Sequence, residues 1–210
     1  WHTLSLHDAL PISMRLGMQN LRKAWRQQHP KLDEILEEST TSVLDEVSAL
    51  DRLVTAFSRF AQLPAPEPRP TAPWALLEAV GRLYEALPPP ELEPDLPIID
   101  VDPETVRQAL VNLVKNAVEA AGPGAVRLAA HRERRDGRLG VTLAVEDDGP
   151  GMDAATVARA TELHFTTKES GSGLGLPIVR RAAEAHGGVL QLSSTPGRGT
   201  RAALWFPARA

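Results

Sequence analysis

Apolar residues recur at helical spacing along the first third of the chain. One run alternates steps of four and three residues and comprises Leu36, Thr40, Val43, Val47, Leu50, Val54, Phe57 and Ala61. Most acidic residues lie off this line, a pattern typical of a coiled-coil-like seam. Met14, Met18, Leu21 and Trp25 repeat the step before an interruption at Pro30. The pattern predicts two antiparallel helices. A lone hairpin buries little apolar surface, so we expect two copies to form a four-helix bundle.

Prolines mark the end of this helical part. The segment LPAPEPRPTAP, residues 63–73, has proline at positions 64, 66, 68, 70 and 73. Proline fixes its own φ, lacks a backbone donor and keeps the preceding residue out of the α region, which predicts a stiff, extended connector. A surface loop inside one domain is the alternative. We therefore divide the chain into a non-native or disordered leader (1–13), a helical hairpin (14–62), a linker (63–73) and a second domain (74–210).

The second domain mixes helix and strand patterns. Residues 74–87 have a helical pattern, and a stronger helix is expected after Asp102 as N-cap, with Pro103 in its first turn and Gly122 at its end. Two strands flank an Asp136–Gly137 turn. A short helix at 153–161, a helix at 174–186 and a final β-hairpin complete the domain. The prediction is an α+β fold, a two-layer α/β sandwich with the helices on one face of a mostly antiparallel sheet.

Composition excludes several classes of partner. The chain has 210 residues, 42% of them apolar and 24% charged, and a net charge of -4. This balance predicts a soluble chain of one or two domains and provides no basic surface for nucleic acid. The apolar runs are shorter than the roughly 18 residues of a membrane span, so we expect no direct membrane contact. The sequence has no cysteine, which fits a reducing interior and a cytoplasmic location.

Two asparagines mark the strong helix as a candidate metal site. Asn112 and Asn116 are four residues apart and therefore share a helix face. A carboxamide oxygen can enter a Mg²⁺ shell without placing another negative charge beside a triphosphate. The alternative is that each asparagine is simply a solvated residue.

The segment DDGPGM follows a predicted strand directly. Gly149 and Gly151 allow the backbone to approach a flat ligand closely, and Asp147 can accept a hydrogen bond from an exocyclic amine such as that of adenine. By itself, the segment is equally well a turn.

A third candidate segment is FTTKESGSGLGLPIVRR. It places Lys168 ahead of Gly171, Gly173 and Gly175, and then begins a helix whose first amides can hold phosphate. The spacing fits neither the P-loop nor the dinucleotide fingerprint. The segment GRGT, residues 197–200, joins the last two strands and is by default a hairpin turn.

Taken together, these segments resemble a known family. The series NLVKNAVEA, DDGPGM, FTTK, GSGLGL and GRGT resembles the N, G1, F, G2 and G3 boxes of the histidine-kinase ATP-binding domain. That family also contains type II topoisomerases, heat-shock 90 chaperones and mismatch-repair ATPases. The resemblance runs from about Ala72 to Pro207. Residues 14–70 resemble the dimerisation and phosphotransfer hairpin of nitrogen-regulation-type sensor kinases.

The resemblance implies a protein-histidine kinase that uses ATP and Mg²⁺. Such a kinase transfers the γ-phosphoryl group to a histidine, for relay to an aspartate of a response-regulator receiver domain. The implied partners are a second copy of the chain and that receiver. The full-length protein is compatible with a membrane anchor outside this sequence.

The resemblance also assigns site residues. It implies Asn116 as the Mg²⁺ ligand, Asp147 as the adenine-binding residue and Thr200 near the adenine end. The remaining implied ATP-binding residues, which include the nucleotide wall and a mobile lid, are Asn112, Gly149, Gly151, Phe165, Thr166, Thr167, Lys168, Gly171, Ser172, Gly173, Leu174, Gly175 and Leu176. Two features depart from the family. Glu119 stands where several members have a basic group, and the segment LPPPELEPDLPIID is short for the expected edge strand.

Three functions compete: a histidine kinase, an ATP-hydrolysing conformational switch and a silent nucleotide-binding fragment. The hydrolysing members of the family place a glutamate one turn before the Mg²⁺ asparagine, where it activates water. Here Asn112 occupies that position. Because an amide cannot take up the proton of that water, the sequence favours the kinase.

A histidine kinase also needs a phosphoacceptor histidine on the first helix of the hairpin. His7 and Asp8 have the right chemistry, because an acid beside an imidazole can orient the ring and take up its proton. The family motif is HExxxP, however, and Pro11 lies four residues after His7. The family's histidine aligns at about Ser5, which is about 200° around a helix from His7. We therefore predict that His7 is not the acceptor and that the chain is cut within the acceptor motif.

Overall fold

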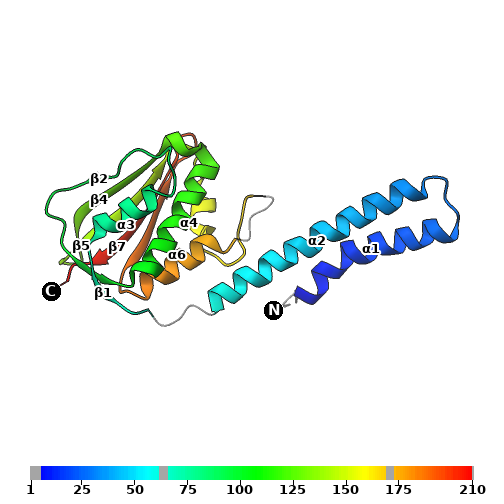
Figure 1. Ribbon diagram of the computed structural model, residues 1–210, viewed down its shortest axis with the longest axis horizontal. Helices are drawn as coiled ribbons and strands as arrows, with labels where there is room; N and C mark the ends of the chain where they lie inside the picture. Colours follow the sequence, from blue (N-terminus) through cyan, green and yellow to red (C-terminus); the bar gives the residue numbers. More distant parts are fainter. Residues whose placement is uncertain (1–5, 62–65, 169–172, 210) are drawn as a thin grey trace. The chain divides into compact units, whose positions relative to one another are not determined.

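The computed structural model describes residues 6–61, 66–168 and 173–209, with the backbone alone for 6–13 and 49–61. The chain divides into two compact units, Trp1–Arg59 and Phe60–Ala210 (Figure 1). The division lies at the end of the second helix, close to the proposed connector. The domain boundaries drawn from the sequence stay predictions.

The first unit is a helical hairpin. Helix α1 (Leu6–Arg26) and helix α2 (Leu32–Ala61) are joined by a short turn and run antiparallel, side by side (Figure 1). In the turn, the His29 backbone N–H donates to the carbonyl of Ala24 at 3.0 Å. The predicted pair of antiparallel helices is therefore confirmed. Helix α1 begins at Leu6 rather than at Met14 and continues through Pro11.

The hairpin buries only part of its apolar residues. Ala24 and Ser39 are buried between the helices. A second set stays exposed, namely Leu16, Met18, Trp25, Leu36, Leu44 and Val47. Leu36 and Val47 of the predicted seam belong to this exposed set, because two helices can cover only the side on which they meet. The exposed set leaves an apolar surface on the hairpin.

The second unit is built on a five-stranded sheet of order β2-β4-β5-β7-β6. Its strands are β2 (Glu91–Leu92), β4 (Val126–Arg135), β5 (Arg138–Asp147), β6 (Val189–Ser194) and β7 (Thr200–Pro207). Only β2 is parallel to its neighbour, and the other pairs are antiparallel. The Asp136–Gly137 turn joins β4 to β5 as predicted, and both of its residues have positive φ. The edge strand β2 is present but has two residues, in keeping with its short segment.

A small second sheet lies within the proline-rich region. Strand β1 (Arg69–Thr71) pairs antiparallel with β3 (Ile99–Val101). The backbone of the predicted connector is extended here, as proline requires. However, this part of it belongs to the second unit, because its ladder is formed with a distant segment.

Helices cover one face of the sheet (Figure 1). They are α3 (Pro73–Gly81), α4 (Pro103–Ala121) and α6 (Gly175–Glu184), while the short α5 (Ala154–Arg159) and the 3₁₀ turn η1 (Pro123–Ala125) lie in the connections. Apolar residues of these helices and of alternate strand positions form one core, which includes Leu77, Val80, Leu110, Val114, Leu128, Leu143, Val179, Leu204 and Phe206. The expected α+β class, a helical hairpin followed by a two-layer α/β sandwich, is confirmed.

Local signals fixed the ends of helix α4. The Asp102 carboxylate accepts the backbone N–H groups of Glu104 and Thr105 at 3.0 and 3.2 Å, and Gly122 ends the helix. Both assignments are as predicted. Helix α3 is shorter than expected, because it ends at Gly81 rather than near residue 87.

Candidate nucleotide-binding site

Helix α4 brings its two asparagines to the edge of the core. Val106, Leu110 and Val114 are fully buried beneath the helix, whereas Asn112 and Asn116 are half-buried. They lie on the same side of the helix, as their spacing predicts. The helix therefore holds both amides beside the core on a rigid element.

Asn116 lies at the beginning of helix α6. A Cβ atom added at Gly175, the first residue of α6, would lie 3.8 Å from Asn116 Nδ2. The preceding residue, Leu174, is buried, and no side chain in the described residues caps this helix end. The beginning of α6 therefore lies close to the Asn116 amide, and an uncapped helix N-terminus favours an anion.

Asp147 occupies the last position of strand β5, on the helix-covered face. Its predecessors on that face, Val141, Leu143 and Val145, are core residues, so Asp147 continues an apolar row with a carboxylate. Its side chain is 8% exposed, and Oδ1 accepts the Gly149 N–H at 2.9 Å. The second carboxylate oxygen remains available to a ligand.

Thr200 lies directly beside Asp147. The two residues are cross-strand partners in the β5–β7 ladder, and opposed residues of a ladder point to the same face. The sequence linked them only through the family resemblance. The register brings them together at the open end of the sheet.

The loop after β5 is held from both sides. Arg127 forms two hydrogen bonds, at 2.8 and 2.7 Å, with the carboxylate of Asp148, and this contact keeps the pKa of Asp148 below its ordinary value. At Gly149, an added Cβ would lie 3.2 Å from the Cβ of Ala120 on α4. The loop therefore passes tightly against the end of helix α4, which explains the need for a residue without a side chain.

The segment from residue 162 to 168 contacts both α5 and helix α4. The guanidinium carbon of Arg159 lies 4.3 Å from the centroid of the Phe165 ring. Lys168 Nζ lies 2.5 Å from the Glu119 carboxylate, and its backbone N–H donates to Thr166 Oγ1 at 3.1 Å. Lys168 is thus brought to the helix that carries Asn116.

Part of the candidate lid lies outside the described residues. Gly171 and Ser172 belong to this part. Thr167 is exposed, Leu176 is half-buried against the core, and the Gly173 carbonyl accepts the His164 N–H at 3.2 Å. The lid assignments drawn from the sequence therefore stay predictions.

His7 and Asp8 belong to helix α1, where the structure describes only the backbone. Ser5 lies outside the described residues. Their role in phosphoryl transfer therefore stays a prediction. In the described part of the chain, no three His, Asp or Glu side chains gather closely enough to hold a metal. The Mg²⁺ assignment accordingly rests on Asn116 as a single protein ligand.

Two polar residues, one of them beside the site, escaped the sequence analysis. His186 is buried; its Nε2 accepts the Asp102 N–H at 3.0 Å and its Nδ1 lies 2.6 Å from the Ala182 carbonyl. It thus joins helix α6 to the beginning of α4. Ser194, the last residue of β6, contacts the two loops beside Asp147. No local pattern marks either residue, because each contacts a segment that is distant in the sequence.

Comparisons with known proteins agree with this geometry. Residues 101–210 match the family of histidine kinase-, DNA gyrase B- and HSP90-like ATPases. Nitrogen regulation protein NtrY of Azorhizobium caulinodans is 30% identical over 200 residues, which are 89% of this chain and 25% of that protein. Sensor protein kinase FleS of Pseudomonas aeruginosa is 51% identical over 104 residues, 50% of this chain and 25% of FleS.

Among solved structures, full-length ShkA in complex with AMPPNP matches with a TM-score of 0.62 at 30% identity, over 99% of this chain and 45% of ShkA. The chain thus spans about a quarter of the length of the two curated relatives. In the described part of the chain, no helix is both long and apolar enough to cross a bilayer.

Proposed function

The chain belongs to the histidine kinase-, DNA gyrase B- and HSP90-like ATPase family, and we propose that it is the ATP-binding catalytic core of a sensor histidine kinase. The observation that carries this proposal is the meeting of four elements, β5, β7, α4 and α6. The Asp147–Thr200 pair ends the sheet, and Asn116 lies beside the uncapped beginning of helix α6. These groups match a base at one end and a triphosphate at the other.

The nucleotide is bound by residues of four segments in this proposal. Asp147 accepts the exocyclic amine of adenine, with Thr200 beside it. The first N–H groups of α6 and the ammonium of Lys168 bind the phosphates. Asn116 would hold Mg²⁺ through its amide oxygen, and the metal would neutralise charge on the triphosphate.

Asn112 favours phosphoryl transfer over hydrolysis. It stands one turn before Asn116 on α4, half-buried and at the edge of the core. An amide cannot accept a proton from an attacking water, whereas transfer to a histidine of the same assembly depends mainly on positioning and charge neutralisation. The ATP-hydrolysing switch therefore remains the less supported function of this site.

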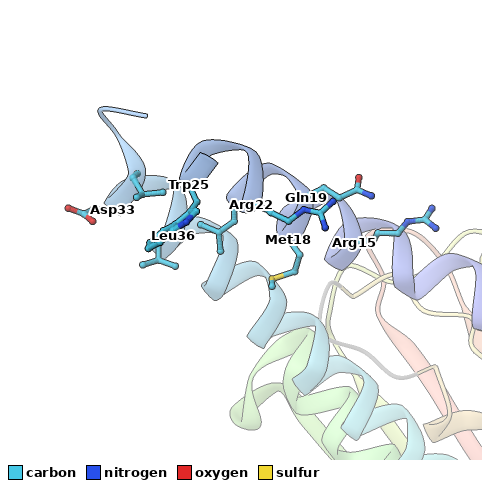
Figure 2. Close-up of a pocket in the computed structure, with 9 residues that line it drawn as sticks. Arg15, Met18, Gln19, Arg22, Trp25, Asp33 and Leu36 are labelled. Atoms are coloured by element: carbon cyan, nitrogen blue, oxygen red, sulfur yellow. The ribbon is translucent and has the colours of Figure 1, made fainter. Parts of the chain in front are cut away.

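The hairpin supports pairing with a second copy. A cavity of about 720 Å³ lies on its surface between α1 and α2 (Figure 2). It is lined by Arg15, Met18, Gln19, Leu21, Arg22, Trp25, Leu32, Asp33 and Leu36. Trp25 is 70% exposed and Met18 54%, and such apolar surface is the usual mark of an interface. We propose a homodimer through this hairpin, with a receiver domain of a response regulator as the further partner.

Calorimetric titration with AMPPNP, in the presence and absence of Mg²⁺, tests the nucleotide site. We expect Asp147→Asn to weaken binding about tenfold or more, since it removes a charged acceptor. Asn116→Ala should remove the Mg²⁺ dependence. Asp148→Asn is the matched control, because Asp148 points to Arg127, and it should bind nearly as the wild type does. Undiminished binding by Asp147→Asn and Asn116→Ala would refute the assignment.

The phosphoacceptor remains a separate proposal. We infer that His7 does not accept the phosphoryl group in this chain, because it is about 200° around a helix from the position of the family motif. Misplacement of a nucleophile by about 1 Å can cost on the order of a hundredfold in rate. Incubation with γ-labelled ATP should give no acid-labile, base-stable phosphate despite good ATP binding, which is the behaviour of a silent fragment. Label that disappears in His7→Gln would overturn this inference.

A further inference from the structure

Ser194 lies at the junction of the two loops that border Asp147. Its hydroxyl oxygen lies 2.8 Å from the backbone nitrogen of Met152, 2.8 Å from the carbonyl oxygen of Gly199 and 2.9 Å from the hydroxyl oxygen of Thr200. The register places Ser194 opposite Thr200, and Thr200 opposite Asp147. The three side chains therefore form a row across neighbouring strands, on the helix-covered face.

The chemistry of its partners fixes the direction of each hydrogen bond. The Met152 N–H can only donate, so Ser194 accepts there. The Gly199 carbonyl can only accept, so Ser194 uses its single hydroxyl proton on that oxygen. In the third contact Thr200 must then be the donor. Thr200 thereby commits its own single proton to Ser194.

This leaves the Thr200 oxygen with lone pairs alone for a ligand. The neighbouring Asp147 carboxylate also presents an acceptor, since Oδ1 is already bonded to the Gly149 N–H. Two acceptors side by side suit a donor group with two N–H bonds. They disfavour a carbonyl oxygen at the same place, because a carbonyl oxygen is itself an acceptor and no proton would then lie between it and Thr200 or Asp147.

We propose that Ser194 is a positioning residue for purine selection, which fixes the Thr200 hydroxyl as an acceptor and so favours a 6-amino purine over a 6-oxo purine. The proposal rests on the nucleotide site described above and adds a residue that does not itself contact the base. Without the Ser194 hydroxyl, Thr200 is free to rotate and to donate. A 6-oxo purine then gains a hydrogen bond that the wild type denies it.

The affinities of the full chain for ATP and ITP, measured calorimetrically, test this proposal. ITP is the suitable probe because it carries a carbonyl at position 6 and lacks the 2-amino group of GTP. We expect Ser194→Ala to narrow the ratio of ATP to ITP affinity about three- to tenfold, the effect of one hydrogen bond. Ser194→Thr keeps a hydroxyl and should keep the ratio. Ser193→Ala, on the other face of β6, is the matched control and should leave it unchanged.

A second variant guards against simple loss of structure. Thr200→Val removes the hydroxyl at similar volume and should weaken ATP binding while leaving ITP binding nearly unchanged. In that background, Ser194→Ala should have no further effect on the ratio. Equal weakening of ATP and ITP by Ser194→Ala, or a ratio that still changes in Thr200→Val, would overturn the proposal. A wild-type chain that binds neither nucleotide would refute the nucleotide site itself, so the two failures are distinguishable.

Discussion

Two glycines of the β6–β7 turn offer a matched pair of perturbations beside the proposed adenine end. Gly197 and Gly199 have nearly the same backbone conformation, with φ of +73° and +76°. A Cβ atom added at Gly197 meets nothing within 4 Å, whereas one added at Gly199 would lie 1.7 Å from the carbonyl oxygen of Asp147. The two alanine variants therefore share the backbone strain of a positive φ, but only Gly199→Ala also brings its Cβ atom into collision with the Asp147 backbone.

The magnitudes follow from these two contributions to the free energy of unfolding. A left-handed conformation costs a residue with a side chain roughly 1–2 kcal/mol, and about 0.4–1 kcal/mol of this is recovered through the unfolded chain. We therefore expect Gly197→Ala to destabilise the second unit by about 1 kcal/mol. Gly199→Ala must also displace the end of β5, and overpacking of this kind adds about 1–3 kcal/mol or more.

Thermal unfolding and nucleotide titration check both parts. At about 2–4 °C per kcal/mol for a unit of this size, Gly197→Ala should lower Tm by a few degrees and Gly199→Ala by roughly 4–16 °C. Because relief of this collision is expected to displace Asp147, Gly199→Ala should also weaken AMPPNP binding about tenfold, whereas Gly197→Ala should leave it within about twofold. Equal changes in the two variants would refute the close approach of Gly199 to Asp147.

Three further predictions address other parts of the molecule. Asp102→Ala should destabilise the second unit by about 1 kcal/mol at neutral pH through loss of the α4 cap. Desolvation raises the pKa of Asp102, but hydrogen bonds from the Thr105, Glu67 and Glu104 N–H groups outweigh it and hold the pKa below its ordinary value. This stabilisation is complete above the unfolded-state pKa of about 3.9 and is lost as the pH falls through the folded-state pKa of Asp102. Asp102→Asn keeps a neutral cap, so the free energies of unfolding of wild type and Asp102→Asn, measured by denaturant titration, should converge below the folded-state pKa. Trp25→Ala should weaken the proposed dimer about tenfold or more, and a sedimentation profile identical to the wild type would exclude Trp25 from the interface. Glu119→Gln should strengthen ATP binding about threefold but not AMP binding, because it frees Lys168 and removes a negative charge near the proposed triphosphate site; equal gains for both nucleotides in a calorimeter would contradict this.

Local chemistry made parts of the fold readable from the sequence. The limits of α4 could be predicted from Asp102, Pro103 and Gly122, and the β4–β5 turn from Asp136–Gly137, because caps and turns use residues adjacent in the chain. Strand β1 was missed for the opposite reason. Its segment reads as a proline-rich connector, and its pairing with β3 depends on residues about thirty positions away.

The candidate site could likewise be predicted only in part from the sequence. Asn116 and Asp147 carry chemistry that can be recognised one residue at a time, and their motifs occur in a known order. Ser194 could not be found in this way. A serine at a strand end is unremarkable until the ladder register places it opposite Thr200 and beside the Met152 loop. Positioning residues become visible only once the strands are aligned.

Glu119 shows how such an alignment changes the meaning of a residue. In the sequence it is a departure, an acid where several relatives of this family have a basic group facing the phosphates. In the structure its carboxylate holds Lys168 at 2.5 Å and lies 3.8 Å from Lys115. Positive charge near the proposed phosphate site therefore comes from Lys168, in the segment after Phe165, as well as from Lys115 on α4. Because that segment lies far from α4 in sequence, the charge beside Asn116 depends on how the segment packs, and a nucleotide that attracts Lys168 must compete with Glu119 for it. We infer that Glu119 leaves the site with a basic residue, Lys168, whose position the nucleotide can change.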